Sequence, residues 1–560
     1  MPERIFIGVA WPYANGPLHM GHIAGCYLAA DIFARYHRLK GNDVLMVSGS
    51  DQHGTPITLR AEQDGVSPQE VVDRYHSEFL QSWDRLGISF DLFTTTGTDN
   101  HREVVQDIFL SLQDKGYIYT DTTPLPYCHT CRRFLPDRYV KGTCPHCSNP
   151  DGRGDQCDQC GKPLNPEDLI DIRCRISGDA PEIRDSEHFF LKLSSFQEQL
   201  LSWVKEQRHW RPNVLNFTQR YLEDGLKDRA ISRDLEWGVP LPVPGYDGKR
   251  IYVWFEAVIG YLSASKEWAA LHGQPDAWEP FWGGDTRGYY FIGKDNIPFH
   301  TIIWPAMLAG YGGLDLPYDV PANEFLNLEG RQLSTSRNWA VWVPDYLERF
   351  EPDPLRYYIS ATMPETSDSD FSWRDFVRRN NDELVATFGN LVHRVLTLTH
   401  RSFQGRVPQP GELEDASREM LSKAQQAFSA VDDSLHACHF RAALGHAMSL
   451  AQEANRYIDQ REPWRTARND PAATANTLWV LLSVINCLKT LLNPFLPFSS
   501  EKLHALLGFP GDATGKGWSW DHSLESMPPG QELPAPAPLF SKLDDDVATA
   551  ELARLGQESA

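Results

Sequence analysis

Short apolar runs alternate with amphipathic stretches over the first fifth of the chain. Residues 4–10 (RIFIGVA) and 43–49 (DVLMVSG) are almost continuously apolar, which is typical of strands buried in a parallel sheet. Between them, residues 19–39 carry apolar side chains at helical spacing, and Gly41 follows the end of this predicted helix. The order predicts a doubly wound α/β sheet, with a ligand outside the carboxyl ends of its strands.

The alternation stops near residue 116 and returns after residue 228. The intervening segment is rich in Gly, Pro, Asp and paired cysteines, so we interpret it as a domain inserted between two halves of the sheet. Residues 250–256 (RIYVWFE) and 288–293 (GYYFIG) predict that the sheet resumes there. Helical periodicity then predicts an antiparallel bundle, and the Pro-rich end of the chain predicts a loosely attached tail. The predicted units are a first half of the sheet domain (1–115), the inserted domain (116–228), the second half (229–320), a mixed region (321–376), the helix bundle (377–525) and the tail (526–560).

Length and charge limit the class of protein. A chain of 560 residues is too long for one core, so several domains are expected. The formal net charge of −22 argues against a protein that coats nucleic acid, but not against an RNA enzyme with a local basic face. No apolar run is long enough to span a bilayer, and the N-terminus lacks the pattern of a secretion signal. We therefore expect a cytoplasmic protein that does not bind membranes.

The most informative motif is His19-Met-Gly-His22, at the start of the first predicted helix. The first turn of a helix offers unpaired N–H groups and a positive dipole end, which together bind phosphate. Gly21 lets a ligand approach the backbone, and His19 and His22 share one face of the helix. In this strand–turn–helix context the motif predicts phosphate binding rather than two incidental surface histidines.

Six of the ten cysteines form three Cys-x-x-Cys pairs between Cys128 and Cys160. Such pairs supply thiolates in tetrahedral geometry, and a closed set of four thiolates is typical of structural zinc. Because the chain has no secretion signal, the spacing favours metal binding over disulfides.

These segments together resemble the methionyl-tRNA synthetases, a family of class I aminoacyl-tRNA synthetases. His19–His22 is similar to the HIGH signature of the class. The segments WPYANG (11–16), DQHGTPI (51–57) and FIGKDNIPFH (291–300) are similar to this family in particular, and the resemblance extends from about residue 4 to about residue 524. It implies a Rossmann-type catalytic domain with an inserted zinc-knuckle domain, followed by an α-helical anticodon-binding bundle. It also implies methionine–tRNA ligase activity, in which ATP with Mg²⁺ activates methionine to methionyl-adenylate and the methionyl group passes to the 3′ end of methionine tRNA.

The resemblance also implies roles for single residues in the two substrate pockets. Asp51 would anchor the α-amino group of methionine through a charge-assisted hydrogen bond, inside an apolar sleeve for the thioether. The Tyr261 hydroxyl and the Trp11 backbone N–H are expected to donate to the sulfur, and the Trp11 ring is expected to alter the mouth of the pocket. The implied methionine site comprises Ala10, Trp11, Tyr13, Asp51, Trp254, Ala257, Val258, Tyr261, Asn296 and His300, and the implied ATP site comprises His19, Gly21, His22, Lys294, Asp295 and Thr335.

The cysteines match the family unevenly. The implied ligands of one structural zinc are Cys144, Cys147, Cys157 and Cys160. Some family members hold a second zinc between a first and a fourth pair. Cys128 and Cys131 match the first pair, but the fourth begins at Cys174 and has Ser177 where a thiolate is expected, so a second zinc on Cys128, Cys131 and Cys174 stays an open question.

The second class signature, KMSKS, corresponds here to Gln332-Leu-Ser-Thr-Ser336, which lacks both lysines. Ser334 and Ser336 remain as implied catalytic residues beside His19 and His22. We expect Arg331 or Arg337, which flank the loop, to supply the missing positive charge. The altered loop leaves two alternatives open: a paralogous or resistance isozyme with altered kinetics, and a non-catalytic tRNA-binding homologue.

Three residues of the bundle are implied to bind the anticodon. Asn390 and Arg394 lie one helical turn apart and share a face, while Trp464 follows Pro463 at a helix end. They would offer hydrogen bonds to base edges and a stacking plane for an unpaired base. Because the residues after about 524 are too few for the dimerising β-barrel that some family members carry, we expect a monomer whose partners are methionine tRNA, methionine and ATP.

Overall fold

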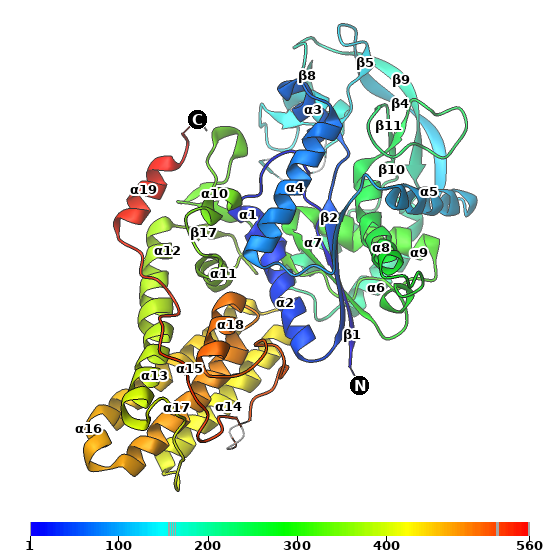
Figure 1. The fold of residues 1–560 in the computed structure, drawn as a ribbon. Coiled ribbons are helices and arrows are strands. Elements are labelled where there is room, and N and C mark those ends of the chain that lie inside the picture. Colours follow the sequence, from blue (N-terminus) through cyan, green and yellow to red (C-terminus); the bar gives the residue numbers. More distant parts are fainter. Residues whose placement is uncertain are drawn as a thin grey trace.

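A parallel five-stranded sheet forms the centre of the catalytic part of the molecule (Figure 1). The computed structural model describes residues 2–557, apart from residues 155, 156, 158, 161, 163, 522, 524 and 525 and the side chains of residues 167 and 336. Strand β1 pairs with both β2 and β13, so segments on either side of the inserted domain share one sheet, and the predicted fold class is confirmed. In sheet order the strands are β14 (Ala322–Asn323), β13 (Arg287–Gly293), β1 (Arg4–Val9), β2 (Asp43–Ser50) and β3 (Leu92–Thr95).

The helix predicted after β1 is present, with an internal irregularity. It begins as α1 (Met20–His22), widens into the π-helical turn η1 (Ile23–Tyr27) and continues as α2 (Leu28–Leu39). Ten of the twelve residues of α2 are buried, because this helix is covered by the sheet on one side and by helical elements on the other. The buried start of the helix fixes His19 and His22 relative to the end of β1.

The strand predicted at residues 250–256 is wrong. Only β12 (Arg250–Ile251) is extended, and it pairs with β11 (Ser232–Arg233) outside the main sheet. Helix α8 (Val253–Leu271) begins two residues later and is buried on nearly every face along its first half. A short run that is apolar on all faces does not distinguish a buried helix from a buried strand. The other predicted strand, residues 288–293, is confirmed as part of β13.

The inserted domain consists of two small sheets around the cysteines. Strands β4 (Ile118–Cys128) and β9 (Glu182–Leu191) form a long antiparallel ladder, flanked by β5 (Arg133–Phe134) and β10 (Arg229–Ala230). The second sheet contains β7 (Gly152–Arg153), β6 (Val140–Thr143) and β8 (Ile170–Cys174). The buried cluster in this region is small and includes several of the cysteines, and small domains with so little core are commonly stabilised by metal ligation.

The helical region at the C-terminal side packs around one apolar helix, α17 (Pro471–Leu492). The sequence predicted no apolar run long enough to span a bilayer, but by length and composition α17 is long and apolar enough to do so. Its whole apolar window is buried inside the bundle, as in a core helix. The helices that pack against it are α13 (Asn390–Phe403), α14 (Asp415–His436), α15 (Phe440–Arg461), α16 (Pro463–Asn469) and α18 (Pro497–Leu506). Helices α12 (Trp373–Arg379) and η9 (Asn380–Gly389) precede α13 along the chain.

The C-terminal segment is not loosely attached over its described residues, contrary to expectation. Leu533 and Leu539 are buried, and helix α19 (Asp546–Arg554) packs against α12 beside α10 (Val343–Leu347) (Figure 1). Arg349 clamps the buried Glu551 through two hydrogen bonds of 2.7 and 2.8 Å. A few apolar side chains and one bidentate ion pair therefore anchor this segment, although its composition predicted no fixed packing.

Candidate active site

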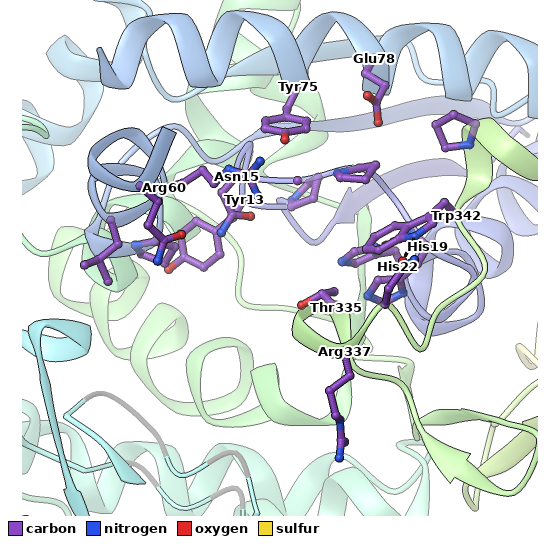
Figure 2. A pocket seen from close by; sticks show the side chains of 18 of the residues that line it. Tyr13, Asn15, His19, His22, Arg60, Tyr75, Glu78, Thr335, Arg337 and Trp342 are labelled. Carbon is purple, nitrogen blue, oxygen red and sulfur yellow. Dashed lines mark hydrogen bonds between the residues drawn. The ribbon is translucent and has the colours of Figure 1, made fainter. Parts of the chain in front are cut away.

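A cleft of about 1070 Å³ opens beyond the carboxyl end of β1 (Figure 2). Its walls come from the β1–α1 connection, from helices α3 (Thr55–Asp64) and α4 (Pro68–Leu86), from the signature loop and from the C-terminal residues Gly556 and Gln557. The sheet edge is where a doubly wound fold binds its ligand. Among the predicted site residues, those lining the cleft are Tyr13, His19, His22, Thr335 and Arg337.

His19 and His22 form a stacked pair in this cleft. Their ring centroids are 3.8 Å apart, and the backbone N–H of His19 donates to Nδ1 of His22 at 3.1 Å. Burial lowers the pKa of His22 to about 4, and burial together with His22 lowers the pKa of His19 well below its ordinary value. Both rings are therefore neutral near pH 7. Since Nδ1 of His22 accepts a hydrogen bond, its proton is on Nε2, where it can be donated to a phosphate.

The signature loop docks directly on the helix start. A Cβ at Gly21 would lie 2.6 Å from Cδ1 of Leu333 and 2.9 Å from the His19 ring, so only glycine leaves room for both. Nearby, the N–H of Met20 donates to the carbonyl of Val341 at 3.0 Å. We expected Gly21 to admit a ligand to the backbone; the structure places Leu333 and the His19 ring over it instead.

The two arginines that flank the loop lie in different surroundings. Arg337 lines the cleft and donates from Nε to Ser334 Oγ at 3.0 Å, although its side chain extends away from the histidine pair (Figure 2). Arg331 is exposed, its guanidinium lies 4.9 Å from the Trp339 ring centre, and it is not among the described residues of the cleft wall. The side chain of Ser336 lies outside the described residues.

Sequence reasoning missed three cationic residues of the cleft. Arg138, Arg153 and Arg175 belong to the inserted domain and line the same cleft. They flank the cysteine knuckles in sequence, but no spacing rule indicates that they face the catalytic domain. Positive charge at this place favours binding of a triphosphate, because the loop without lysines supplies little positive charge of its own.

Asp51 lies directly after β2 with only 3% of its surface exposed. The N–H of His53 donates to its carboxylate at 3.1 Å, and the ring of His53 donates from Nδ1 to the buried Glu256 at 3.0 Å. Burial and then the Glu256 carboxylate raise the pKa of Asp51 well above its ordinary value. The protein groups around Asp51 therefore do not fully neutralise its negative charge, and an ammonium group of a substrate could do so. Sequence reasoning did not single out His53 or Glu256.

The predicted aromatic sleeve is assembled around α8. The Trp254 ring stacks on Phe299 at 4.4 Å and meets Tyr13 edge-on at 6.0 Å. The Tyr261 hydroxyl donates to Nε2 of His300 at 2.7 Å, because Nδ1 of His300 donates to the Asn296 carbonyl at 2.9 Å. Burial lowers the pKa of His300 to about 4, so this ring is a neutral acceptor. The Tyr261 proton is therefore directed to His300 rather than to a substrate sulfur. Ala257 and Val258 are buried on the same helix, and Ala10 lies at the end of β1.

The Trp11 ring points inward rather than to the mouth of the cleft. A Cβ at Gly49 or Gly260 would lie 2.3 or 2.7 Å from the indole, so these two glycines make the space that the ring fills. The indole also lies 6.2 Å from the His101 ring, and its buried Nε1 has no hydrogen-bond partner within the described part of the chain.

Lys294 and Asp295 follow β13, as predicted, but Lys294 is already paired with other carboxylates of the protein. Nζ of Lys294 forms ion pairs with Glu324 at 2.8 Å and Asp368 at 2.7 Å. Asp295, the next residue along the chain, has an exposed side chain. To contact a phosphate, Lys294 would have to give up at least one of these carboxylates.

The predicted metal ligands cluster in the inserted domain. The sulfur atoms of Cys144, Cys147, Cys157 and Cys160 all lie within 4.8 Å of one another, and Cys147 and Cys157 are 3.6 Å apart. Four converging thiols are the donor set of a closed structural zinc site, so the residues fit the predicted ion.

The predicted anticodon residues lie on the bundle, away from the cleft (Figure 1). Trp464 is 42% exposed, and the Arg394 guanidinium lies 5.4 Å from its ring centre. Arg394 also pairs with Asp459 at 2.7 Å, and Asn390 is exposed one turn earlier on α13. The structure therefore brings Arg394 and Trp464 together at the surface.

Comparison with known proteins gives consistent matches along the chain. Residues 5–396 match the model for "tRNA synthetases class I (M)", and residues 407–559 match the "Anticodon binding domain of methionyl tRNA ligase". The methionine–tRNA ligase of Dehalococcoides mccartyi is 60% identical over 99% of this chain and 100% of the relative, and that of Thermomicrobium roseum is 55% identical over the full length of both. The structure of Mycobacterium tuberculosis methionyl-tRNA synthetase in complex with methionyl-adenylate superposes with a TM-score of 0.79 at 27% identity, over 96% of this chain and 99% of that one.

Proposed function

Since this chain belongs to the class I methionyl-tRNA synthetases and has their methionine–tRNA ligase activity, we propose that both steps of the reaction take place in the cleft at the end of β1. In the first step, the methionine carboxylate attacks the α-phosphorus of ATP and pyrophosphate leaves. In the second, the terminal ribose hydroxyl of tRNA attacks the carbonyl carbon of the adenylate and AMP leaves. The protein contributes positioning and fixed charge rather than a covalent nucleophile.

We assign the phosphate contacts to the stacked histidines, and this pair is the observation that carries the proposal. Neutral His19 and His22 donate N–H groups from a helix start, and Lys294, Asp295 and Thr335 complete the nucleotide site. Asp51 binds the substrate ammonium, and the sleeve around Trp254 and Tyr261 encloses the thioether. With Mg²⁺ accompanying ATP, positive charge from the arginines in the cleft stabilises the departing pyrophosphate.

Arg337 is our choice for the residue that replaces the missing lysines, because it lines the cleft and Arg331 does not. Arg337→Ala should slow adenylate formation by on the order of a hundredfold, the loss of one preorganised charge contact. Arg331→Ala is a matched control from the same loop and should be nearly silent. Methionine-dependent exchange of pyrophosphate into ATP measures this step without tRNA, and equal effects of the two variants would refute the assignment.

The same assay separates the chain from the two alternatives that the altered loop left open. A housekeeping ligase performs the exchange and then charges methionine tRNA at a comparable rate. A specialised isozyme would show altered kinetics, and a non-catalytic homologue would bind tRNA but show no exchange.

The finer assignments of partners and metal also belong to this proposal. The surface set Asn390, Arg394 and Trp464 is proposed to bind the anticodon of methionine tRNA, and the chain is proposed to act as a cytoplasmic monomer. Zinc held by Cys144, Cys147, Cys157 and Cys160 would stabilise the inserted domain, whose arginines face the cleft. Elemental analysis should find at least one tightly held zinc, and Cys157→Ser should release it.

A further inference from the structure

A second group of thiols lies in the inserted domain, apart from the closed set of four. The sulfur atoms of Cys128, Cys131 and Cys174 lie within 4.8 Å of one another, with 3.8 Å between Cys131 and Cys174. Cys128 and Cys174 are almost fully buried. Three converging thiols without a fourth are the feature to be explained.

Ser177 occupies the fourth corner of this group. Its Oγ lies 3.4 Å from Sγ of Cys128, and its N–H donates to Sγ of Cys174 at 3.5 Å. The N–H of Cys131 donates to Sγ of Cys128 in the same way, at 3.4 Å. Ser177 therefore has the same position relative to Cys174 as the second cysteine of a knuckle has relative to the first.

The backbone around Ser177 is that of a metal-binding knuckle. The N–H of Cys174 donates to the Asp179 carbonyl at 2.8 Å, and the N–H of Gly178 donates back to the Cys174 carbonyl at 2.9 Å. The Cys144 knuckle repeats both bonds, to Asn149 at 2.9 Å and from Ser148 at 3.0 Å. The residue after the second ligand position is left-handed in both, with φ of 80° at Gly178 and 59° at Ser148. The two knuckles share these backbone features, and the second ligand position of the Cys174 knuckle is a hydroxyl where the Cys144 knuckle has a thiol.

The neighbouring groups hold Ser177 in place, and among the described residues none adds a fourth His, Cys, Asp or Glu ligand to the three thiols. The N–H of Asp179 donates to Ser177 Oγ at 3.2 Å, which fixes one lone pair of the hydroxyl. His129 is the nearest imidazole in the sequence, but its Nε2 is bonded to Glu182 at 2.6 Å. Ser177 itself is partly exposed, so solvent reaches this corner.

We propose that Cys128, Cys131, Cys174 and Ser177 form a second zinc site, with three thiolates and one oxygen, that exchanges its ion readily while the four-cysteine site retains its own. A neutral hydroxyl is a weaker donor than a thiolate, and a C–O bond is shorter than a C–S bond, so Ser177 holds the fourth position loosely. Water competes for that position, which gives an entering chelator or thiol a place to bind. The proposal does not depend on aminoacylation.

The test is metal content and release in the full-length protein, kept reduced and saturated with zinc. We expect two equivalents of zinc. Excess EDTA should release them in two phases, and the fast rate should exceed the slow rate by roughly 10–100-fold, the usual effect of weakening a metal site. Ser177→Cys should slow the fast phase until it merges with the slow one. Cys174→Ser should remove the fast equivalent alone, and Cys157→Ser should remove the slow one.

Cobalt substitution identifies the ligands independently of release rates. In the protein loaded with two Co²⁺ ions, Ser177→Cys should increase the thiolate-to-metal charge-transfer absorption, because the second site changes from three thiolates to four. One equivalent of metal in the saturated wild type, two equivalents leaving at one rate, or a Ser177→Cys variant with unchanged release and spectrum would each overturn the proposal.

Discussion

Asn338 ties the C-terminal segment to the signature loop through its bonds to Gln557 and Gly556. Its side-chain amide donates to the Gln557 carbonyl, and its own carbonyl accepts from the N–H of Gly556 at 3.0 Å. Oδ1 of the same side chain accepts from Nε1 of Trp342 at 2.8 Å, and the backbone is left-handed with φ of 49°. One residue thus joins the C-terminal segment, the loop and the wall of the cleft.

This relationship predicts that the C-terminal segment positions the loop for adenylate formation. Asn338→Gly keeps the left-handed backbone but removes both side-chain bonds, each worth about 1 kcal/mol, so the rate of pyrophosphate exchange should fall by roughly tenfold. The KM for methionine should not change, because the methionine sleeve is built from other elements. Removing residues 546–560 should lower the rate at least as far, and normal exchange in both variants would contradict the positioning role.

A second prediction concerns the space that Gly260 leaves for Trp11. Gly260→Ala places a Cβ 2.7 Å from the indole, and such overpacking typically costs about 1–3 kcal/mol. We expect the KM for methionine to rise by roughly tenfold while the KM for ATP stays unchanged. The double variant Gly260→Ala/Trp11→Leu is the control and should recover methionine binding, because the smaller side chain vacates the space. If it does not recover, the glycine acts through α8 and not through Trp11.

The sequence predicted local elements well where pattern and turn chemistry agreed. The strand–turn–helix at His19 and the strand before Asp51 were both found, because an apolar run followed by Gly and helical spacing has few other solutions. The strand predicted at residues 250–256 was wrong because the first half of α8 is buried on nearly every face, which removes the periodicity that identifies a helix.

Contacts between distant segments could not be predicted in the same way. Arg138 and Arg175 reach the cleft, and Gln557 reaches Asn338, only because separate units pack together. Such contacts leave no pattern in the local sequence. The tail was misjudged for a related reason. Its composition resembles that of a disordered segment, yet Leu539 is buried and Glu551 pairs with Arg349 in the body of the protein.

The third prediction is a pH dependence of methionine binding through Asp51. The pKa of this carboxyl is raised above its ordinary value of 3.8 in the free protein, by burial and then by Glu256. The substrate ammonium binds the ionised form, so affinity should fall as the pH is lowered through the raised pKa, and binding below it should release a proton. Calorimetry in two buffers of different ionisation enthalpy measures that release.

A variant separates Asp51 from the neighbouring pair of titratable groups. Glu256 raises the pKa of His53 despite its burial, so this pair also titrates near the pocket. Asp51→Asn should bind methionine weakly and without proton release at any pH. Proton release that persists in this variant would assign the titration to His53 and Glu256.

The last prediction concerns the exposed Trp464 and the half-buried Arg394 beside it. Trp464→Ala removes a stacking plane worth roughly 1–3 kcal/mol per base, so charging of methionine tRNA should fall by about one to two orders of magnitude. Pyrophosphate exchange without tRNA should stay intact, since the ring lies on the bundle far from the cleft. Trp464→Phe keeps a stacking face and should retain most of the charging activity. Arg465→Ala, which removes an exposed charge from the same helix, is the matched control and should be close to wild type. Loss of both activities together in Trp464→Ala would mean that the ring supports the bundle and does not contact the anticodon.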